Sequence, residues 1–141
     1  MTVDYRYGST CPCSFRLAQD AFLKRGKAAN GHSQRSTAKI KVQLDPDNPI
    51  WIEDIVELAR RQIPTEVQIF MKRRDEQAQA ELSGSNTLFT EDSSRLLYEG
   101  LDSLYNQGKI LDFSCVTEHE ESIHPYNAIA IMYKGLPEGL R

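Results

Sequence analysis

Residues 38–44, AKIKVQL, alternate regularly between apolar and polar side chains. In an extended chain the two kinds fall on opposite sides: Ile40, Val42 and Leu44 against Lys39, Lys41 and Gln43. A period of two is typical of a half-buried β-strand and does not fit a helix. The stretch therefore predicts a sheet with one face packed against a core.

Three further segments have strand character. Residues 3–7 alternate between large apolar and charged side chains, and Gly8 is the expected end of that strand. Residues 111–116 alternate in the same way. Residues 128–133, AIAIMY, are apolar enough to predict a strand that is covered on both faces.

Two segments have helical spacing. In the first, Asn48 is the expected N-cap and Pro49 the first helical residue, and apolar residues at helical spacing follow as far as Pro64. In the second, Thr90 is the expected N-cap, carboxylates occupy the first turn, and Gly108 is the expected terminator. Both helices are long enough to pack on a sheet.

The segments outside these elements are less regular. The connection over residues 14–36 allows a helical turn or two in its first half, and a short extended piece covers residues 67–71. Residues 73–86 are polar and loop-like. The expected order is therefore two strands, two helices and two strands, an α+β domain with an antiparallel sheet and two helices on one face, over residues 1–141.

Composition excludes several classes of function. The 141-residue chain carries a net charge of −3, which gives no basic field for nucleic acid. It contains no apolar run of the roughly 20 residues that a membrane span needs, and its N-terminus does not resemble a secretory signal. We therefore expect a cytoplasmic protein in a reducing compartment that binds neither nucleic acid nor membrane.

The pair Cys11–Pro12–Cys13 has four possible roles: a disulfide, a metal ligand, a reactive nucleophile, or core packing. A reducing compartment and an odd total of three cysteines disfavour the disulfide. Thiolate, imidazole and carboxylate together are the usual ligands of Zn²⁺ and similar ions. His32 and the carboxylates of residues 75–76 and 118–121 could supply the other two types.

Five motifs, read in order, resemble the type IB GTP cyclohydrolases of prokaryotic pterin synthesis: CPCS, HSQRS, KRRDEQ, NTLFTED and DFSCVTEHEESIHPYNAIA. The match runs from about residue 9 to residue 131. The resemblance implies a tunnelling fold (T-fold), with the order two strands, two helices, two strands. It also implies the hydrolysis of GTP to 7,8-dihydroneopterin triphosphate and formate.

The resemblance implies a divalent metal, Zn²⁺, Mn²⁺ or Fe²⁺, whose ligands at the matching positions are Cys11, His32 and Glu76. Cys11 is preferred to Cys13 because the first cysteine of the family's motif looks like the ligand. If residues 11–13 are extended, both thiols point the same way, so the sequence leaves Cys13 open.

Further roles are implied for the substrate site. Glu91 looks like an acid/base in the ring-opening steps. Glu121 looks like the anchor of the purine, because a carboxylate accepts two hydrogen bonds from the pyrimidine edge of guanine. His124 would assist proton transfer or hold the ribose. Arg35 and the basic residues 72–74 are candidates for the triphosphate on charge alone.

The family also implies identical subunits that assemble into a barrel, with active sites at their interfaces. Its members usually carry two T-fold modules, and this sequence matches the second, catalytic type. Two alternatives stay open. One is a non-catalytic or split-enzyme module that needs a partner. The other is a deazapurine nitrile reductase on the same fold, in which a cysteine of lowered pKa attacks the substrate.

Overall fold

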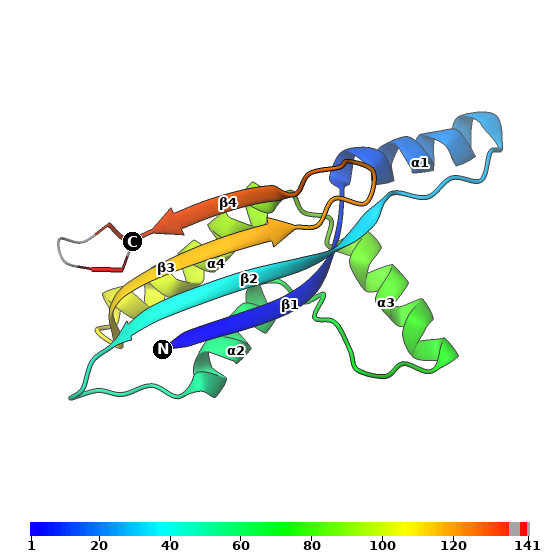
Figure 1. Ribbon diagram of the computed structural model, residues 1–141. Coiled ribbons are helices and arrows are strands. Elements are labelled where there is room, and N and C mark those ends of the chain that lie inside the picture. Colours follow the sequence, from blue (N-terminus) through cyan, green and yellow to red (C-terminus); the bar gives the residue numbers. More distant parts are fainter. Residues whose placement is uncertain (136–138, 141) are drawn as a thin grey trace.

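The computed structural model describes residues 1–135, 139 and 140 and contains one four-stranded sheet (Figure 1). All neighbouring strands are antiparallel, and their spatial order follows the chain. The strands are β1 (Thr2–Thr10), β2 (Ser33–Leu44), β3 (Ile110–His119) and β4 (Ala128–Tyr133). The predicted antiparallel sheet is confirmed. The single domain predicted over residues 1–141 includes residues 136–138 and 141, which lie outside the described ones.

Four helices accompany the sheet: α1 (Pro12–Arg25), α2 (Ile52–Gln62), α3 (Arg73–Ser85) and α4 (Thr90–Asn106). Helices α2 and α4 lie together on one face, where α2 contacts β1 and α4 contacts β3 and β4 (Figure 1). Helices α1 and α3 project beyond the end of the sheet where β1 finishes and β2 starts (Figure 1). The described helices include none that is long and apolar enough to cross a membrane.

The observed order is β1-α1-β2-α2-α3-α4-β3-β4, which differs from the predicted order of two strands, two helices and two strands. The prediction missed α1 and α3 as full helices. Pro12 at the first position favours α1, and Gly26, with a left-handed φ of 61°, ends it. In α3, Asp75 accepts a hydrogen bond from the Lys72 backbone N–H over 2.8 Å.

The starts of the two predicted helices also differ. Helix α2 begins at Ile52 rather than Pro49, because Asp54 accepts the backbone N–H of Trp51 over 2.8 Å and closes the first turn. Helix α4 begins at Thr90 itself, since Asp92 accepts the N–H of Phe89 over 3.2 Å. In both helices a carboxylate two residues inside the helix does the capping.

The core lies between the sheet and the pair α2 and α4. Its fully buried side chains include Ile40, Phe113, Ile55 and Leu97, and each contributes roughly 2 kcal/mol through burial. A Cβ on Gly100 would lie 3.0 Å from Leu58 Cδ2, so the absence of a side chain lets the two helices approach closely. The N-terminus of α4 is held against β3 by the Thr117 hydroxyl, which donates to the Thr90 carbonyl over 3.0 Å.

Two strand predictions need correction. Strand β4 is covered on one face only, because Ile129, Ile131 and Tyr133 are 59%, 62% and 51% exposed. The extended piece predicted for residues 67–71 is not a strand, and the isolated bridge between Tyr7 and Glu66 is the nearest pairing. Strands β1, β2 and β3 are longer than predicted, and β1 continues through Gly8 to Thr10.

Candidate active site

A cavity of about 280 Å³ lies at the end of the sheet, beneath the N-terminus of α4. It is formed by the β1–α1 junction, the start of β2, the first turn of α4 and the segment that follows β3. Five residues that the sequence singled out line it: Cys11, His32, Glu91, Glu121 and His124. The fold therefore brings together chemistry-bearing side chains that are up to 113 positions apart (124 − 11).

Cys11 and His32 are held side by side by their backbones. The Cys11 N–H donates to the His32 carbonyl oxygen over 3.2 Å. The Ser14 hydroxyl accepts the His32 backbone N–H over 3.0 Å and donates to the Cys11 carbonyl over 3.3 Å. Because Pro12 starts α1, the segment is not extended as a whole; Cys11 lines the cavity, while Cys13 is exposed and does not line it. All three cysteines are free thiols.

Two hydrogen bonds between side chains, through Gln34, link His32 to Glu121. Nδ1 of His32 lies 3.0 Å from Oε1 of Gln34, and Nε2 of Gln34 donates to Oε1 of Glu121 over 3.2 Å. Since the amide oxygen only accepts, the neutral ring of His32 carries its proton on Nδ1 and keeps the lone pair on Nε2. His32 is thus prepared to ligate a cation through Nε2.

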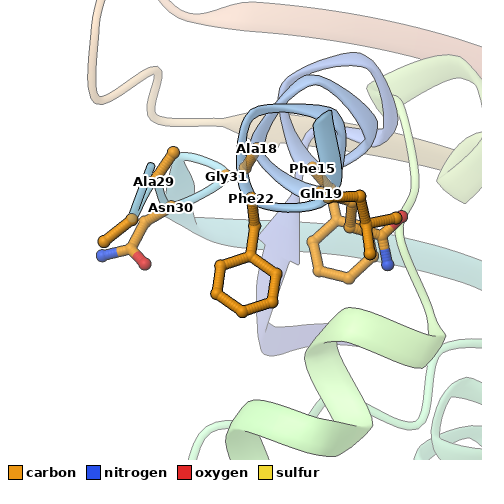
Figure 2. A pocket seen from close by; sticks show the side chains of 9 residues that line it. Phe15, Ala18, Gln19, Phe22, Ala29, Asn30 and Gly31 are labelled. Atoms are coloured by element: carbon orange, nitrogen blue, oxygen red, sulfur yellow. The ribbon is translucent and has the colours of Figure 1, made fainter. Parts of the chain in front are cut away.

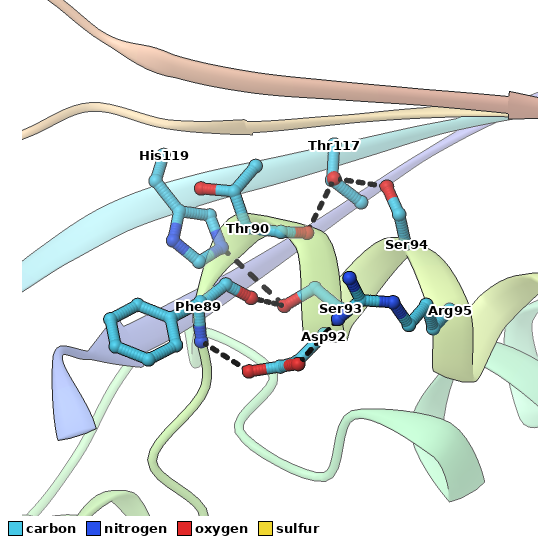
Figure 3. Close-up of polar contacts among 8 residues, drawn as sticks. All are labelled: Phe89, Thr90, Asp92, Ser93, Ser94, Arg95, Thr117 and His119. Atoms are coloured by element: carbon cyan, nitrogen blue, oxygen red, sulfur yellow. Dashed lines mark hydrogen bonds and ion pairs between the residues drawn. The ribbon is translucent and has the colours of Figure 1, made fainter.

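Glu91 lines the cavity from the first turn of α4. Its neighbour Asp92 is engaged with the Phe89 N–H and, over 2.9 Å, with Arg95 (Figure 3). The two adjacent carboxylates therefore differ in role: Asp92 caps the helix and Glu91 faces the cavity.

His119 forms part of the buried wall of the cavity and is 1% exposed. Its Nε2 lies 2.9 Å from the hydroxyl of Tyr7 and 3.5 Å from that of Ser93 (Figure 3 shows the Ser93 contact). Burial lowers the pKa of His119 to about 4, although the Glu91 carboxylate acts in the opposite direction. The imidazole is therefore neutral near pH 7.

His124 and Tyr126 line the outer side of the cavity. Their rings stack with centroids 5.1 Å apart and an angle of 6° between planes. Both residues are exposed and lie in the segment between β3 and β4. A flat, exposed pair of rings gives the cavity a surface against which a planar ligand could pack.

Two sequence-predicted site residues lie elsewhere. Arg35 follows Gln34 in β2, so it projects from the opposite face of the sheet and lines a separate hollow with Arg6. Glu76 is exposed in the first turn of α3 and lines a hollow between α3 and α1. Within the described part of the chain, no three His, Cys, Asp or Glu side chains are arranged to hold a metal ion.

A second hollow of about 500 Å³ lies along α1 (Figure 2). Its large apolar side chains are Phe15, Phe22 and Leu23, and the other lining residues are Ala18, Gln19, Ala28, Ala29, Asn30 and Gly31. None of these nine residues has a titratable side chain, so this hollow offers no acid–base or metal chemistry. The polar cavity beneath α4 is the candidate active site.

The sequence-based prediction placed Gln34 and His119 in polar clusters but assigned neither a role in the site. Both positions follow from strand alternation: Gln34 shares the buried face of β2 with Ile40, and His119 shares the buried face of β3 with Cys115. Extending the predicted strands by three or more residues would have placed both on the helix side. The polar character of the two segments concealed that continuation.

Comparisons with known proteins identify the family of this chain. The family described as type I GTP cyclohydrolase folE2 matches residues 1–130. A protein named GTP cyclohydrolase FolE2 from Roseobacter denitrificans is 44% identical over 136 residues, which cover 96% of this chain and 36% of that protein. The protein of the same name from Ruegeria sp. (strain TM1040) is 45% identical over 134 residues, covering 94% and 36%. The chain thus spans about a third of the length of the curated relatives it matches, and it belongs to the folE2 family of type I GTP cyclohydrolases.

Proposed function

We propose that this chain is a metal-dependent GTP cyclohydrolase of the type IB kind, acting in pterin and folate biosynthesis. GTP and water would give 7,8-dihydroneopterin triphosphate and formate. The observation that carries the proposal is the cavity beneath α4, where a thiol, three imidazoles and two carboxylates from a folE2-type sequence converge: Cys11, His32, His119, His124, Glu91 and Glu121.

Cys11 and His32 fit a divalent cation such as Zn²⁺, Mn²⁺ or Fe²⁺. They provide a thiol and an imidazole whose Nε2 is free, with backbones tied by a hydrogen bond. A cation held there would supply Lewis acidity, which makes water a nucleophile near neutral pH. Glu76 is exposed and outside this cavity, so we propose that it reaches a site only within an assembly of several copies.

Glu121 would hold guanine by accepting its two pyrimidine-edge N–H groups, and Gln34 fixes the orientation of that carboxylate. Glu91 would transfer protons during ring opening, because it faces the cavity without a capping duty. His124 would assist proton transfer or hold the ribose. Arg35 remains a candidate for the triphosphate, on the opposite face of the sheet.

We further propose the T-fold and a homo-oligomeric barrel for this sheet. The antiparallel order β1-β2-β3-β4, with α2 and α4 on one face, is compatible with that architecture. The exposed apolar row Ile129, Ile131 and Tyr133 lies on an edge strand, where a neighbouring copy could cover it. The interior of such a barrel would be the face opposite the helices.

The direct test is an assay of the purified chain, stripped of metal and resupplied with Zn²⁺, Mn²⁺ or Fe²⁺. Formate release and pterin fluorescence after oxidation would be followed with GTP as substrate. Metal-dependent product that is lost in Cys11→Ala and in Glu91→Ala supports the proposal. Bound metal and nucleotide without product would contradict it and favour a module that needs a partner chain.

A further inference from the structure

His119 presents one of its two ring nitrogens to the candidate cavity. Nε2 faces Tyr7 and Ser93, whereas Nδ1 has no hydrogen-bond partner among the described residues. Among the described residues, the fully buried side-chain polar atom that lacks a partner is Asp112 Oδ1. Nδ1 of His119 also lacks a partner but does not belong to that class, so it is not fully buried. It therefore has access to the cavity that His119 lines.

The surrounding hydroxyls determine which nitrogen carries the proton. Ser93 donates its hydroxyl hydrogen to the Phe89 carbonyl over 3.2 Å (Figure 3). The Tyr7 hydroxyl has two acceptors nearby: Nε2 of His119, 2.9 Å away, and the less favourably placed Ser93 hydroxyl. Burial raises the pKa of Tyr7 to about 12, so this hydroxyl keeps its hydrogen.

If Nε2 carried the proton, the Tyr7 hydrogen would have to turn from the 2.9 Å contact with Nε2 to the less favourably placed Ser93 hydroxyl, which weakens a buried hydrogen bond. With the proton on Nδ1, Tyr7 donates to Nε2 and every hydroxyl in the cluster is satisfied. The neutral imidazole then directs an N–H donor into the cavity.

This donor and the Glu121 carboxylate face the same cavity. His119 ends β3 opposite Ser36, and the backbone continues antiparallel, since the Glu120 N–H donates to the Arg35 carbonyl over 2.9 Å. Gln34, two residues before Ser36, contacts Glu121, two residues after His119. His119 and Glu121 therefore line the same cavity, as does Gln34 on the neighbouring strand.

We propose that His119 is a specificity-determining residue that donates a hydrogen bond from Nδ1 to the keto oxygen O6 of the purine. The inference rests on the proposed binding of guanine by Glu121. The pyrimidine edge of guanine presents two donors, the 2-amino group and N1–H, followed by the acceptor O6. Glu121 accepts from the two donors and His119 complements the acceptor, so together they match guanine and reject a 6-amino purine.

The test uses the full chain as purified and compares binding of GTP and 6-thio-GTP, whose sulfur is a weaker hydrogen-bond acceptor. Tyr7→Phe removes the hydroxyl that holds the His119 tautomer while retaining the ring. The matched control is Tyr5→Phe, which removes a hydroxyl that donates to the Ile63 carbonyl over 2.7 Å on the same strand. We expect Tyr7→Phe to reduce the preference for GTP by about threefold to tenfold, and Tyr5→Phe to leave it unchanged.

A second measurement concerns the tautomer itself. In protein labelled with ¹⁵N at histidine, the two ring nitrogens of a neutral imidazole have distinct chemical shifts, and the expected result is a protonated Nδ1 in His119. A protonated Nε2 would overturn the inference. An unchanged GTP preference in Tyr7→Phe would overturn the role of His119 and leave the guanine site standing. A wild-type chain that binds neither nucleotide would overturn the guanine site, and the inference with it.

Discussion

Gln34 donates a hydrogen bond from Nε2 to Oε1 of Glu121 over 3.2 Å, and its own Oε1 lies 3.0 Å from Nδ1 of His32. The amide cannot be reversed without placing its oxygen against a carboxylate. The orientation of the Gln34 amide therefore determines which ring nitrogen of His32 carries the proton, and it also positions the Glu121 carboxylate. One 8%-exposed side chain joins the proposed metal ligand to the proposed purine anchor.

Replacing Gln34 by Glu separates these two functions. A carboxylate at residue 34 can still accept from Nδ1 of His32, but it repels Glu121. We expect GTP affinity to fall about tenfold, the effect of roughly 1.4 kcal/mol, while affinity for Zn²⁺ is retained. Calorimetric titration of each ligand measures both quantities. Gln43→Glu, on the exposed face of the same strand, is the control; equal GTP affinity in Gln34→Glu and wild type would contradict the prediction.

Ser14→Ala tests the geometry of the proposed metal ligands. The Ser14 hydroxyl bridges the His32 N–H and the Cys11 carbonyl, so its loss frees the loop that carries His32. We expect Zn²⁺ affinity to fall about tenfold, the lower end of the range for supporting residues around a metal site. Competition with a chromophoric chelator measures it. Ser85→Ala removes a serine hydroxyl on α3 that donates to the Glu81 carbonyl, and the Zn²⁺ affinity of this variant should equal that of wild type.

The sheet was predictable because alternation survives in the sequence. Ile40 and Val42 of β2 are buried and Lys39 and Lys41 are exposed, as the period of two requires. Helix α3 was not predictable from apolar spacing, because none of its residues is buried. Its stability depends on the capping carboxylate of Asp75 and on local pairs, and a polar sequence with these features also reads as a loop.

The site was predictable only in part, for two different reasons. Arg35 carries the charge that a triphosphate needs, but strand alternation places it on the opposite face from its neighbour Gln34. That result was available from the sequence once β2 was extended backwards. The separation of Glu76 from Cys11 was not available, because it depends on where α3 packs beyond the sheet.

The place of Glu76 leads to a prediction about mixed assemblies. If Glu76 of one copy completes the cavity of another, mixtures of Cys11→Ala and Glu76→Ala chains contain some intact sites. We expect two inactive variants, unfolded together and refolded as a mixture, to regain partial GTP cyclohydrolase activity. Cys11→Ala mixed with His32→Ala is the control, because both residues line the cavity of one chain, and that mixture should remain inactive. Equal inactivity of both mixtures would show that Glu76 of one copy does not complete the cavity of another.

The buried His119 should make folding sensitive to acid. Its pKa is lowered by burial from the usual 6.5 to about 4, so between these values the unfolded chain binds a proton that the folded chain does not. Linkage then requires the free energy of unfolding to decrease as the pH falls from 6.5 towards 4. Above pH 6.5, His119 does not change the free energy of unfolding with pH. Between pH 7 and pH 5 the loss is about 2 kcal/mol, at 1.36 kcal/mol for each pH unit below 6.5.

Urea unfolding of wild type and His119→Gln at both pH values isolates this loss. Glutamine does not titrate, and its amide oxygen can accept the Tyr7 hydroxyl in place of Nε2. Titration of the carboxylates affects both proteins and cancels in the difference between them. The stability difference between wild type and variant should therefore change by about 2 kcal/mol in favour of the variant at pH 5. A difference that is the same at both pH values would show that His119 is protonated in the folded protein as readily as in the unfolded chain.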